Sequence, residues 1–311
     1  MKNGGTHRLQ WPDIPVEVCS GIARALGSPV IDAAGQSGGY GPGLVARCVL
    51  ANGRRVFIKA VSPLQNPDSV LMMRREAEVT QSLPDDAPAP ALLHVLDDGF
   101  WVVLVFEDIE GALPTIPWDA QQLARVVEAM NHLSRLPTWS ALPTVVERYG
   151  EMLSGWRILA AAGPAAVNEP WCRDHLEELA ALEAQWEDAA AGDHLVHGDV
   201  RSDNVLFSND GRVVFVDWST SCIGAPWFDL VAMLPSIELE GGGAPESVLR
   251  LAESELDPQV LVPVVAAIAG YFVERGRLPD PPGLPTLRDF QRAQARVTVD
   301  WLRRLWPTAA H

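Results

Sequence analysis

The chain has 311 residues, of which 48% are apolar, and its 40 acidic residues outnumber its 24 basic residues to give a formal net charge of −16. This composition supplies enough apolar surface for a large core, which excludes a disordered chain and a small disulfide-stabilised scaffold. A strongly negative surface repels phosphate backbones and anionic lipids, so we expect no nucleic-acid partner and no membrane-surface role. The same charge favours a partner that carries positive charge.

Cysteine usage and hydropathy indicate a reduced, cytoplasmic setting. The four cysteines are Cys19, Cys48, Cys172 and Cys222. They are scattered along the chain, so the close pairs typical of zinc sites are missing. The N-terminal segment lacks the apolar stretch of a signal peptide. The longest apolar run, Leu261–Val273, is interrupted by Pro263 and is too short to cross a bilayer.

The first hundred or so residues are rich in strand signals. Two β-rich runs, Leu44–Leu50 and Arg55–Val61, are joined through Asn52-Gly53, a dipeptide typical of tight hairpin turns. The other elements predicted here are a helix over Pro15–Leu26, a helix over Ser69–Leu83, and strands over Leu92–Leu96 and Phe100–Phe106. These elements predict a small, mostly antiparallel sheet with a helix packed on it.

The pattern changes near residues 107–111, after which helical periodicity dominates. Helices are predicted over Leu123–Leu133, Leu176–Trp186, Pro245–Glu255, Gln259–Arg275 and Leu287–Leu305. Only His194–Asp217 is β-rich in this part of the chain. We therefore expect an α+β protein of two lobes, with a β-rich lobe over residues 1–108 and a larger, mainly helical lobe over residues 109–311.

The segment around residues 195–218 carries the clearest chemical pattern. An apolar strand leads into His197-Gly198-Asp199, Asn204 opens a β-hairpin, and Asp217 closes that hairpin. Single aspartates at strand ends are commonly turn residues, but this ordered set favours a functional site. Hard oxygen ligands brought to one edge suit Mg²⁺ that arrives with substrate phosphates. A remaining carboxylate can position and deprotonate an attacking hydroxyl.

This segment resembles the catalytic and metal loops of the aminoglycoside phosphotransferase family, which is related to the protein kinases. The resemblance implies a protein-kinase-like bilobal fold in which Asp199 is the catalytic base, while Asn204 and Asp217 hold Mg²⁺. It also implies that His197 and Asp229 support the catalytic loop structurally. No recognisable activation segment lies between Asp217 and Asp229, which argues against a protein kinase.

A fold of this kind also needs a strand lysine that holds the nucleotide phosphates and a helix glutamate that pairs with it. Lys59 lies inside an apolar strand, where an unpaired ammonium group would lose its hydration at high cost. Glu76 and Glu78 compete as its partner. Glu76 shares a helical face with apolar residues, whereas Glu78 shares a face with arginines and is expected to face solvent. The pattern therefore predicts a pair between Lys59 and Glu76.

The resemblance implies ATP or GTP as the phosphate donor. Its candidate contacts are Ser37, Gly38 and Gly39 in a glycine-rich loop, and the backbone at Glu107 and Ile109 in the hinge. Glycine loops let backbone N–H groups approach phosphates, although this one matches neither the P-loop nor the protein-kinase spacing. The loop also fits Gly-x-Ser-x-Gly, the nucleophile motif of serine hydrolases. Strands follow it instead of the required helix, which disfavours a hydrolase.

The acceptor is the least specified part of the prediction. Families of this kind phosphorylate aminoglycosides, macrolides, choline, homoserine and sugars. Because the net charge favours a cationic acceptor, we expect an aminoglycoside or a related amino-sugar, with the others as alternatives. Candidate acids for its amines are Asp203, Glu238, Glu240, Glu274 and Asp300. A nucleotide-binding interaction protein without catalysis is a further alternative, although Lys59, Asp199, Asn204 and Asp217 are all present.

Overall fold

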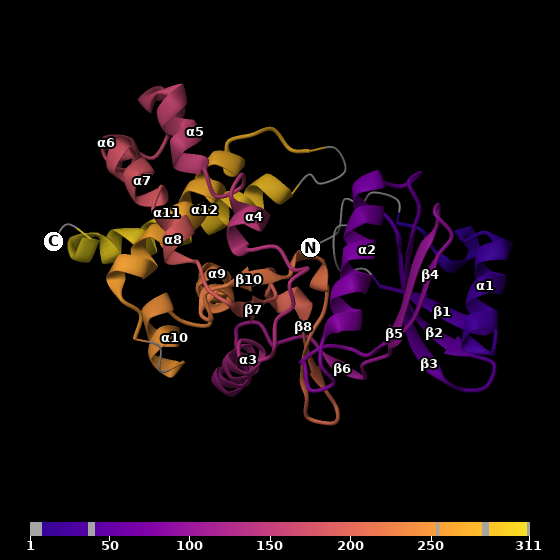
Figure 1. The fold of residues 1–311 in the computed structure, drawn as a ribbon. Helices are drawn as coiled ribbons and strands as arrows, with labels where there is room; N and C mark the ends of the chain where they lie inside the picture. The colour runs from indigo at the N-terminus through magenta and orange to yellow at the C-terminus, as the bar shows by residue number, and fades with distance from the viewer. Residues whose placement is uncertain (1–7, 37–40, 253–254, 282–285, 310–311) are drawn as a thin grey trace. The chain divides into compact units, whose positions relative to one another are not determined.

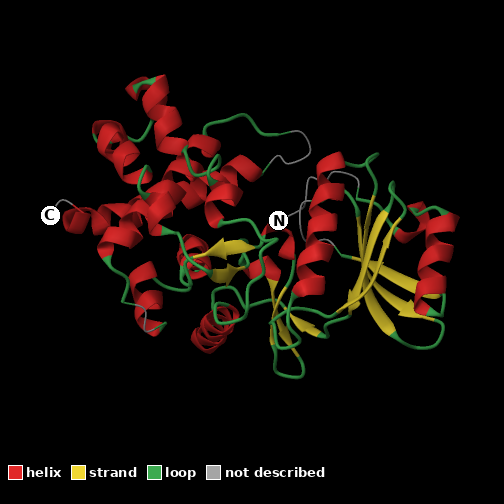
Figure 2. Ribbon diagram, in the orientation of Figure 1, coloured by secondary structure: helices red, strands yellow, loops and turns green. Residues whose placement is uncertain are grey.

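The computed structural model describes residues 8–36, 41–252, 255–281 and 286–309 (Figure 1). The chain divides into two compact units. The N-terminal unit comprises Met1–Leu113 and Ser202–Thr220, and the C-terminal unit comprises Pro114–Arg201 and Ser221–His311. Strands dominate the first unit and helices the second, as Figure 2 shows. The predicted combination of a β-rich part and a mainly helical part is confirmed.

A five-stranded antiparallel sheet forms the centre of the N-terminal unit. Its strands are β1 (Val30–Gly35), β2 (Leu44–Leu50), β3 (Arg55–Val61), β4 (Leu92–Asp97) and β5 (Val102–Glu107), in the spatial order β1-β2-β3-β5-β4. Strand β1 has no counterpart among the elements predicted from the sequence. Four of its six residues are exposed, so this edge strand lacks the apolar alternation by which the other strands were recognised.

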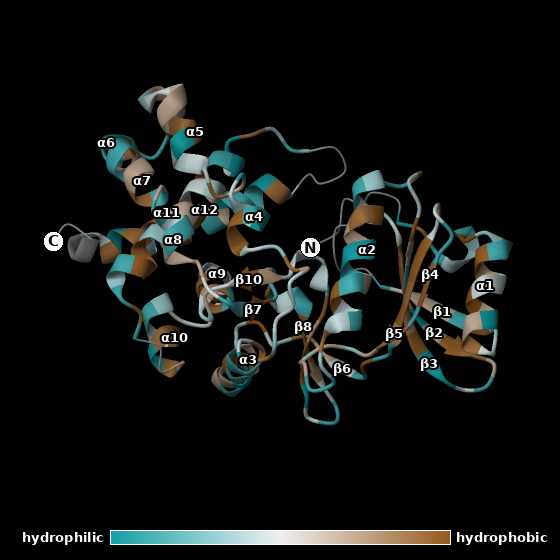
Figure 3. Ribbon diagram, in the orientation of Figure 1, coloured by the Kyte–Doolittle hydropathy of each residue, from teal (hydrophilic) through white to brown (hydrophobic). Residues whose placement is uncertain are grey.

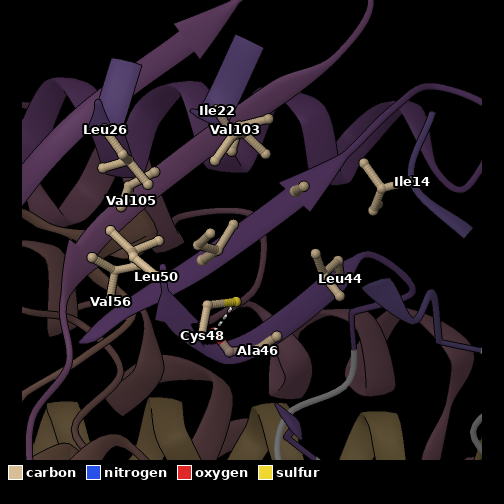
Figure 4. Packing of buried hydrophobic residues seen from close by; sticks show 12 residues of the cluster. Ile14, Ile22, Leu26, Leu44, Ala46, Cys48, Leu50, Val56, Val103 and Val105 are labelled. Carbon is tan, nitrogen blue, oxygen red and sulfur yellow. Dashed lines mark hydrogen bonds between the residues drawn. The ribbon is translucent and has the colours of Figure 1, made fainter. Parts of the chain in front are cut away.

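Helix α1 (Val16–Leu26) covers one face of this sheet. Its Ile22 and Leu26 lie in one buried cluster with Val103 and Val105 of β5, as Figure 4 shows. Alternate residues of β5 point to opposite faces because a strand has a side-chain period of two. The α1-facing core therefore takes only every second residue of this strand.

Helix α2 (Pro67–Ser82) covers the opposite face. Val70 and Ala77 of this helix lie in a second buried cluster with Val102, Leu104 and Phe106 of β5. Figure 3 shows hydrophobic residues along β5, in agreement with a strand that is buried on both faces. The sheet is thus the middle layer between two helices.

The segment Ser202–Thr220 belongs with the N-terminal unit although it lies far along the chain. Its hairpin of β8 (Val205–Ser208) and β9 (Val213–Phe215) pairs with the short strand β6 (Gly111–Ala112). The predicted division at residues 108 and 109 treats each lobe as one continuous stretch. The structure differs because pairing between strands joins segments that are distant in sequence.

The C-terminal unit is built around α11, a helix that is buried along most of its length. Its helices are α3 (Ala120–Leu133), α4 (Val145–Tyr149), α5 (Gly155–Ala162), α6 (Pro170–Asp174), α7 (Leu176–Glu183), α8 (Trp186–Ala189), α9 (Phe228–Leu239), α10 (Pro245–Leu251), α11 (Pro258–Gly276) and α12 (Leu287–Ala309). A two-stranded sheet pairs β7 (His194–Val196) with β10 (Cys222–Gly224). By length and composition α11 could cross a membrane, but 67% of its most apolar window is buried inside the protein.

Helices α5, α7 and α11 pack closely together in this unit. The helix predicted over Leu176–Trp186 is interrupted, so that α7 and α8 are separate. Glu183 at the end of α7 accepts hydrogen bonds from the backbone N–H groups of Trp156 and Arg157 at 2.8 and 2.9 Å. A Cβ atom on Gly155 would lie 2.0 Å from the carbonyl oxygen of Gly270. Glycine is therefore required where α5 begins against α11.

Candidate active site

Lys59 and Glu76 form a close ion pair in the N-terminal unit. Lys59 lies on β3 with the side-chain parity of Val61, which belongs to the α2-facing core, so its side chain points toward α2. Its Nζ lies 2.6 Å from Oε1 and 2.9 Å from Oε2 of Glu76, and the Glu76 side chain is buried. Burial lowers the pKa of Lys59, but the negative charges of Glu76 and Asp217 raise it more. The ammonium group is therefore held in its charged form.

Glu78 faces away from this pair and is exposed on α2. We expect Glu76→Gln to weaken Mg–ATP binding by about 10-fold to 100-fold, the range typical of losing a hydrogen bond between charged groups. Glu78→Gln is expected to change it by less than about twofold, since exposed charges contribute little. Calorimetric titration of both variants with Mg–ATP measures the difference. A larger loss from Glu78→Gln would mean that the helix face has been assigned wrongly.

Asp217 lies next to this pair, just beyond β9. Its Oδ1 is 3.8 Å from Nζ of Lys59, and its carboxylate is 46% exposed. Its φ angle is 70°, and among the described residues other than glycine it is the one with a positive φ. Left-handed backbone is uncommon outside glycine and is frequently retained at functional sites. The side chain of Ser219 donates a hydrogen bond to Oδ1 at 3.3 Å.

Asn204 is brought beside Asp217 by the β8–β9 hairpin. The carbonyl oxygen of Asn204 accepts a hydrogen bond from the N–H of Val216, the residue before Asp217, at 3.0 Å. Asn204 itself is buried. The structure therefore brings the two predicted metal residues and Lys59 together within one unit.

The donor set of Asn204 and Asp217 fits a magnesium ion. An amide oxygen and a carboxylate oxygen are hard ligands, and Mg²⁺ is commonly bound by one or two such groups, with water and substrate phosphates completing its shell. Over the described ranges, no group of three or more His, Cys, Asp or Glu side chains is arranged to hold a metal. The chemistry of the site thus suits a cation that is shared with a nucleotide.

The His197-Gly198-Asp199 loop follows β7 in the C-terminal unit. The Asp229 carboxylate, at the start of α9, accepts hydrogen bonds from the N–H groups of His197 and Gly198 at 2.7 and 2.8 Å. The Tyr149 hydroxyl donates to the carbonyl oxygen of Gly198 at 2.8 Å. His197 is fully buried, and its Nδ1 accepts from the N–H of Asp199 at 3.2 Å. His197 and Asp229 therefore hold the loop from within.

Burial alters the ionisation of Asp229, which lies near Asp199. Burial raises the pKa of Asp229 to about 6, although its two backbone hydrogen bonds lower it, and the negative charge of Asp199 adds to the increase. Asp199 itself is more accessible, with 35% of its side chain exposed, and Arg201 Nη1 lies 3.7 Å from its Oδ1. Asp199 can thus meet a small molecule, whereas Asp229 cannot.

The hinge residues have different backbone partners. The N–H of Glu107 donates to the carbonyl of Ala91 at 2.9 Å, and the carbonyl of Ile109 accepts from Arg47 Nη1 at 2.9 Å. The N–H of Ile109 has no hydrogen-bond partner within the part of the chain that the structure describes. Of these three groups, it is the one that could receive a purine nitrogen. Ser37, Gly38 and Gly39 lie outside the described residues.

The five acids expected to receive an acceptor's amines have separate surroundings. Glu238 pairs with Arg304 at 3.2 Å, and Asp300 pairs with Arg303 at 3.2 Å. Glu240 accepts a hydrogen bond from Trp118 Nε1 at 2.8 Å, and Glu274 lies 3.3 Å from Arg275 Nε. Asp203 is exposed and belongs to the N-terminal unit. Each acid of the C-terminal unit among them thus already has a partner within the protein.

Sequence reasoning missed several groups of the site. Tyr149 precedes the loop by almost fifty residues, so no local pattern links the two. Arg201 occupies a position at which the family motif is variable. Asp108 lies between the two hinge candidates and has no predicted role, yet its side chain is buried and forms ion pairs with Arg47 and Arg55 at 2.8 and 2.9 Å. An acidic residue that closely follows an apolar strand is a sequence signal that could have identified this last group.

Comparisons with known proteins agree with this arrangement. Residues 46–271 match the phosphotransferase enzyme family, abbreviated APH. The homoserine kinase of Rhodospirillum rubrum is 31% identical over 194 residues, which cover 60% of this chain and 57% of that kinase. The chain therefore spans little more than half the length of this curated relative.

Solved structures show the same fold at low identity. Choline kinase LicA from Streptococcus pneumoniae has a TM-score of 0.60 at 14% identity, covering 93% of this chain and 98% of its own. A thermostable aminoglycoside phosphotransferase mutant, solved with AMP-PNP and hygromycin B, has a TM-score of 0.58 at 15% identity, with coverage of 94% and 98%. The macrolide 2′-phosphotransferase MphH from Brachybacterium faecium has a TM-score of 0.56 at 13% identity, with coverage of 91% and 96%.

These structures confirm the expected protein-kinase-like fold, and the family match covers more than half of the residues. The strand lysine, the helix glutamate and the Asp199, Asn204 and Asp217 positions follow one another along the chain in the order that the resemblance implied. The chain therefore belongs to the phosphotransferase enzyme family.

Proposed function

We propose that the protein transfers the γ-phosphate of ATP to a hydroxyl group of a small molecule and uses Mg²⁺ to do so. The observation that best supports this function is the arrangement of Lys59, Glu76 and Asp217, in which the lysine lies 2.6 Å from one carboxylate and 3.8 Å from the other. A lysine held charged beside a carboxylate that can bind a cation is suited to a polyphosphate. Asp199 precedes Asn204 by only five positions in the sequence.

The residues then have distinct tasks in the proposed reaction. Asn204 and Asp217 hold the metal, which neutralises phosphate charge when it is bound. Lys59 binds the phosphates, and the N–H of Ile109 receives the purine. Asp199 orients the acceptor hydroxyl and takes its proton as the new oxygen–phosphorus bond forms. The bond between the β- and γ-phosphates breaks and ADP leaves, so positioning and charge stabilisation supply most of the acceleration.

Two acceptor classes have support of different kinds. The net charge of −16 favours a cationic amino-sugar, and a fold neighbour was solved with hygromycin B. The likeness to a homoserine kinase favours a hydroxy amino acid. The four candidate acids of the C-terminal unit already have partners within it, which weakens the support for the amino-sugar. AMP-PNP in the neighbour supports ATP over GTP. The cytoplasmic setting stays a prediction from the sequence.

A coupled assay of ADP release tests the proposed function. Mg–ATP is offered with an amino-sugar and its N-acetylated counterpart, a macrolide, choline, L-homoserine and a neutral sugar. We expect one class of hydroxyl compound to raise ADP release at least about tenfold above the rate without acceptor, and chelation of Mg²⁺ to abolish the increase. Phosphorus NMR of the product identifies the modified hydroxyl. ADP release that no acceptor stimulates would favour the non-catalytic interaction protein instead.

A further inference from the structure

Arginines gather where α11 ends and α12 begins, in a chain whose overall charge is strongly negative. Arg275 and Arg277 lie at the end of α11, and Arg288 and Arg292 lie in the first two turns of α12. The two helices pack against each other over much of their length. A local excess of positive charge here needs an explanation that the net charge does not provide.

Internal partners account for three of these arginines. Arg292 pairs with Asp289 at 2.5 Å and donates to the carbonyl oxygen of Gly276 at 2.9 Å. Arg275 and Arg277 both approach Glu274, at 3.3 and 3.9 Å. Positive groups at the end of a helix are also stabilised by its dipole. Nothing beyond local stability is required of these three residues.

Arg288 differs from them in both respects. It donates hydrogen bonds to the carbonyl oxygen of Pro279 at 3.1 Å and to Oε1 of Gln291 at 2.6 Å. Over the ranges that the structure describes, it forms no ion pair with a carboxylate. As the second residue of α12, it also carries its positive charge where the helix dipole is unfavourable. Its charge is therefore not explained by the fold.

Gln291 connects Arg288 to Tyr271 on α11. The Gln291 side chain is almost fully buried, with 4% of the residue exposed, and its oxygen accepts from Arg288. Its NH₂ group is thus directed to its other partner, the hydroxyl of Tyr271. Arg288, Gln291 and Tyr271 form a row of polar groups between the two helices. Each of them can donate a hydrogen bond to an anion.

Contacts of α4 and α5 link this row to the loop that carries Asp199. Tyr149 at the end of α4 binds the carbonyl of Gly198, and the next helix, α5, begins at Gly155 in contact with the backbone of Gly270 and Tyr271. Burial raises the pKa of Tyr271, the charges of Arg275 and Arg288 lower it, and the negative charge of Asp199 raises it. Tyr271 thus packs against the start of α5, the helix that follows the one whose Tyr149 holds the loop of Asp199.

We propose that Tyr271, Arg288 and Gln291 recognise a carboxylate on the acceptor, which makes the substrate a small hydroxy acid or hydroxy amino acid. This inference rests on the proposed function and specifies its acceptor. A planar guanidinium matches the geometry of a carboxylate, and an incoming carboxylate supplies the counter-charge that Arg288 lacks among the residues that the structure describes. The acceptor hydroxyl is then presented to Asp199 from the opposite end of the molecule.

Direct binding tests the recognition without depending on turnover. The full-length protein with Mg–ADP is titrated with L-serine, L-homoserine, D-glycerate and 4-hydroxybutyrate, and with the carboxamide of each. At least one carboxylate is expected to bind about 10-fold to 100-fold more tightly than its carboxamide, the range for a hydrogen bond to a charged group. Arg288→Gln should remove this preference, and Arg288→Lys should restore part of it. The matched control Arg292→Gln should keep it.

Kinetics with the preferred acceptor separates this inference from the proposed function. Arg288→Gln should raise the KM for the acceptor while the KM for Mg–ATP changes less than about twofold. Equal binding of every carboxylate and its carboxamide overturns the inference. Phosphorylation of an amino-sugar, or of a hydroxyl compound whose anionic group is a phosphate, in place of the hydroxy acids also overturns it, but leaves the proposed function standing. A hydroxy acid that binds through Arg288 without ever being phosphorylated contradicts the proposed function and not the recognition site.

Discussion

Asp199→Asn is expected to lower kcat by about 10²-fold to 10⁴-fold, the usual contribution of a general base, with any acceptor that the unmodified protein phosphorylates. The amide keeps the size of the side chain but cannot take the hydroxyl proton. Affinity for Mg–ATP should change less than about twofold, because Asp199 is assigned to the acceptor and not to the metal.

Asp193→Asn is a matched control for this variant. Asp193 lies just before β7 with 96% of its side chain exposed, so its loss should leave kcat unchanged. The two measurements needed are steady-state turnover and calorimetric titration with Mg–ATP. Near-normal turnover of Asp199→Asn would show that another group activates the acceptor.

Asp217→Asn should act on the nucleotide. We expect the Kd for Mg–ATP to rise on the order of tenfold or more, which corresponds to about 1.4 kcal/mol for each factor of ten. Asparagine tolerates the left-handed backbone that Asp217 adopts at φ 70°, so the substitution removes the charge without adding strain. A loss of Mg–ATP affinity in this variant is therefore due to the missing ligand to the cation and not to a disturbed loop.

Asp210→Asn in the turn of the same hairpin provides the control. Asp210 is 57% exposed and interacts with Arg212, away from the lysine pair. Titrations with ATP in the presence and absence of Mg²⁺ should show that the effect of Asp217→Asn requires the metal. Equal Mg–ATP affinity in Asp217→Asn and the unmodified protein would exclude Asp217 as a metal ligand.

The central strands of the sheet could be predicted from the sequence because they are buried in a regular alternation. The predicted bounds of Leu44–Leu50 and Arg55–Val61 are those of β2 and β3. Strand β1 could not be predicted, since an edge strand with mostly exposed residues has little hydrophobic pattern. The pairing of β6 with β8 depends on contacts between distant segments, which local periodicity does not contain.

In the candidate site, a residue's partner could be predicted from the sequence where one physical requirement determined it. A lysine in an apolar strand needs a buried counter-charge, and helical periodicity selects Glu76 over Glu78 as its source. In the structure Lys59 does pair with Glu76. The surroundings of an acceptor could not be inferred in the same way. Net charge is a sum over the whole surface, whereas recognition depends on local groups such as Arg288, whose partners become known only when α11 and α12 are packed together.

The burial of the Asp229 carboxylate beneath the His197–Asp199 loop has a thermodynamic consequence. Its pKa is about 6 in the folded protein against 3.8 as the ordinary value, so the folded state binds a proton more readily than the unfolded chain. The stabilisation that this proton provides is fully present below the unfolded value and is lost as the pH rises through about 6. At neutral pH the ionised carboxylate therefore lowers the free energy of unfolding. Acidification would restore the lost stability. The added proton would also convert one of the two Asp229 oxygens, which accept hydrogen bonds from His197 and Gly198, into a hydroxyl. Lower pH therefore favours the folded state but disfavours the hydrogen bonds that hold the loop.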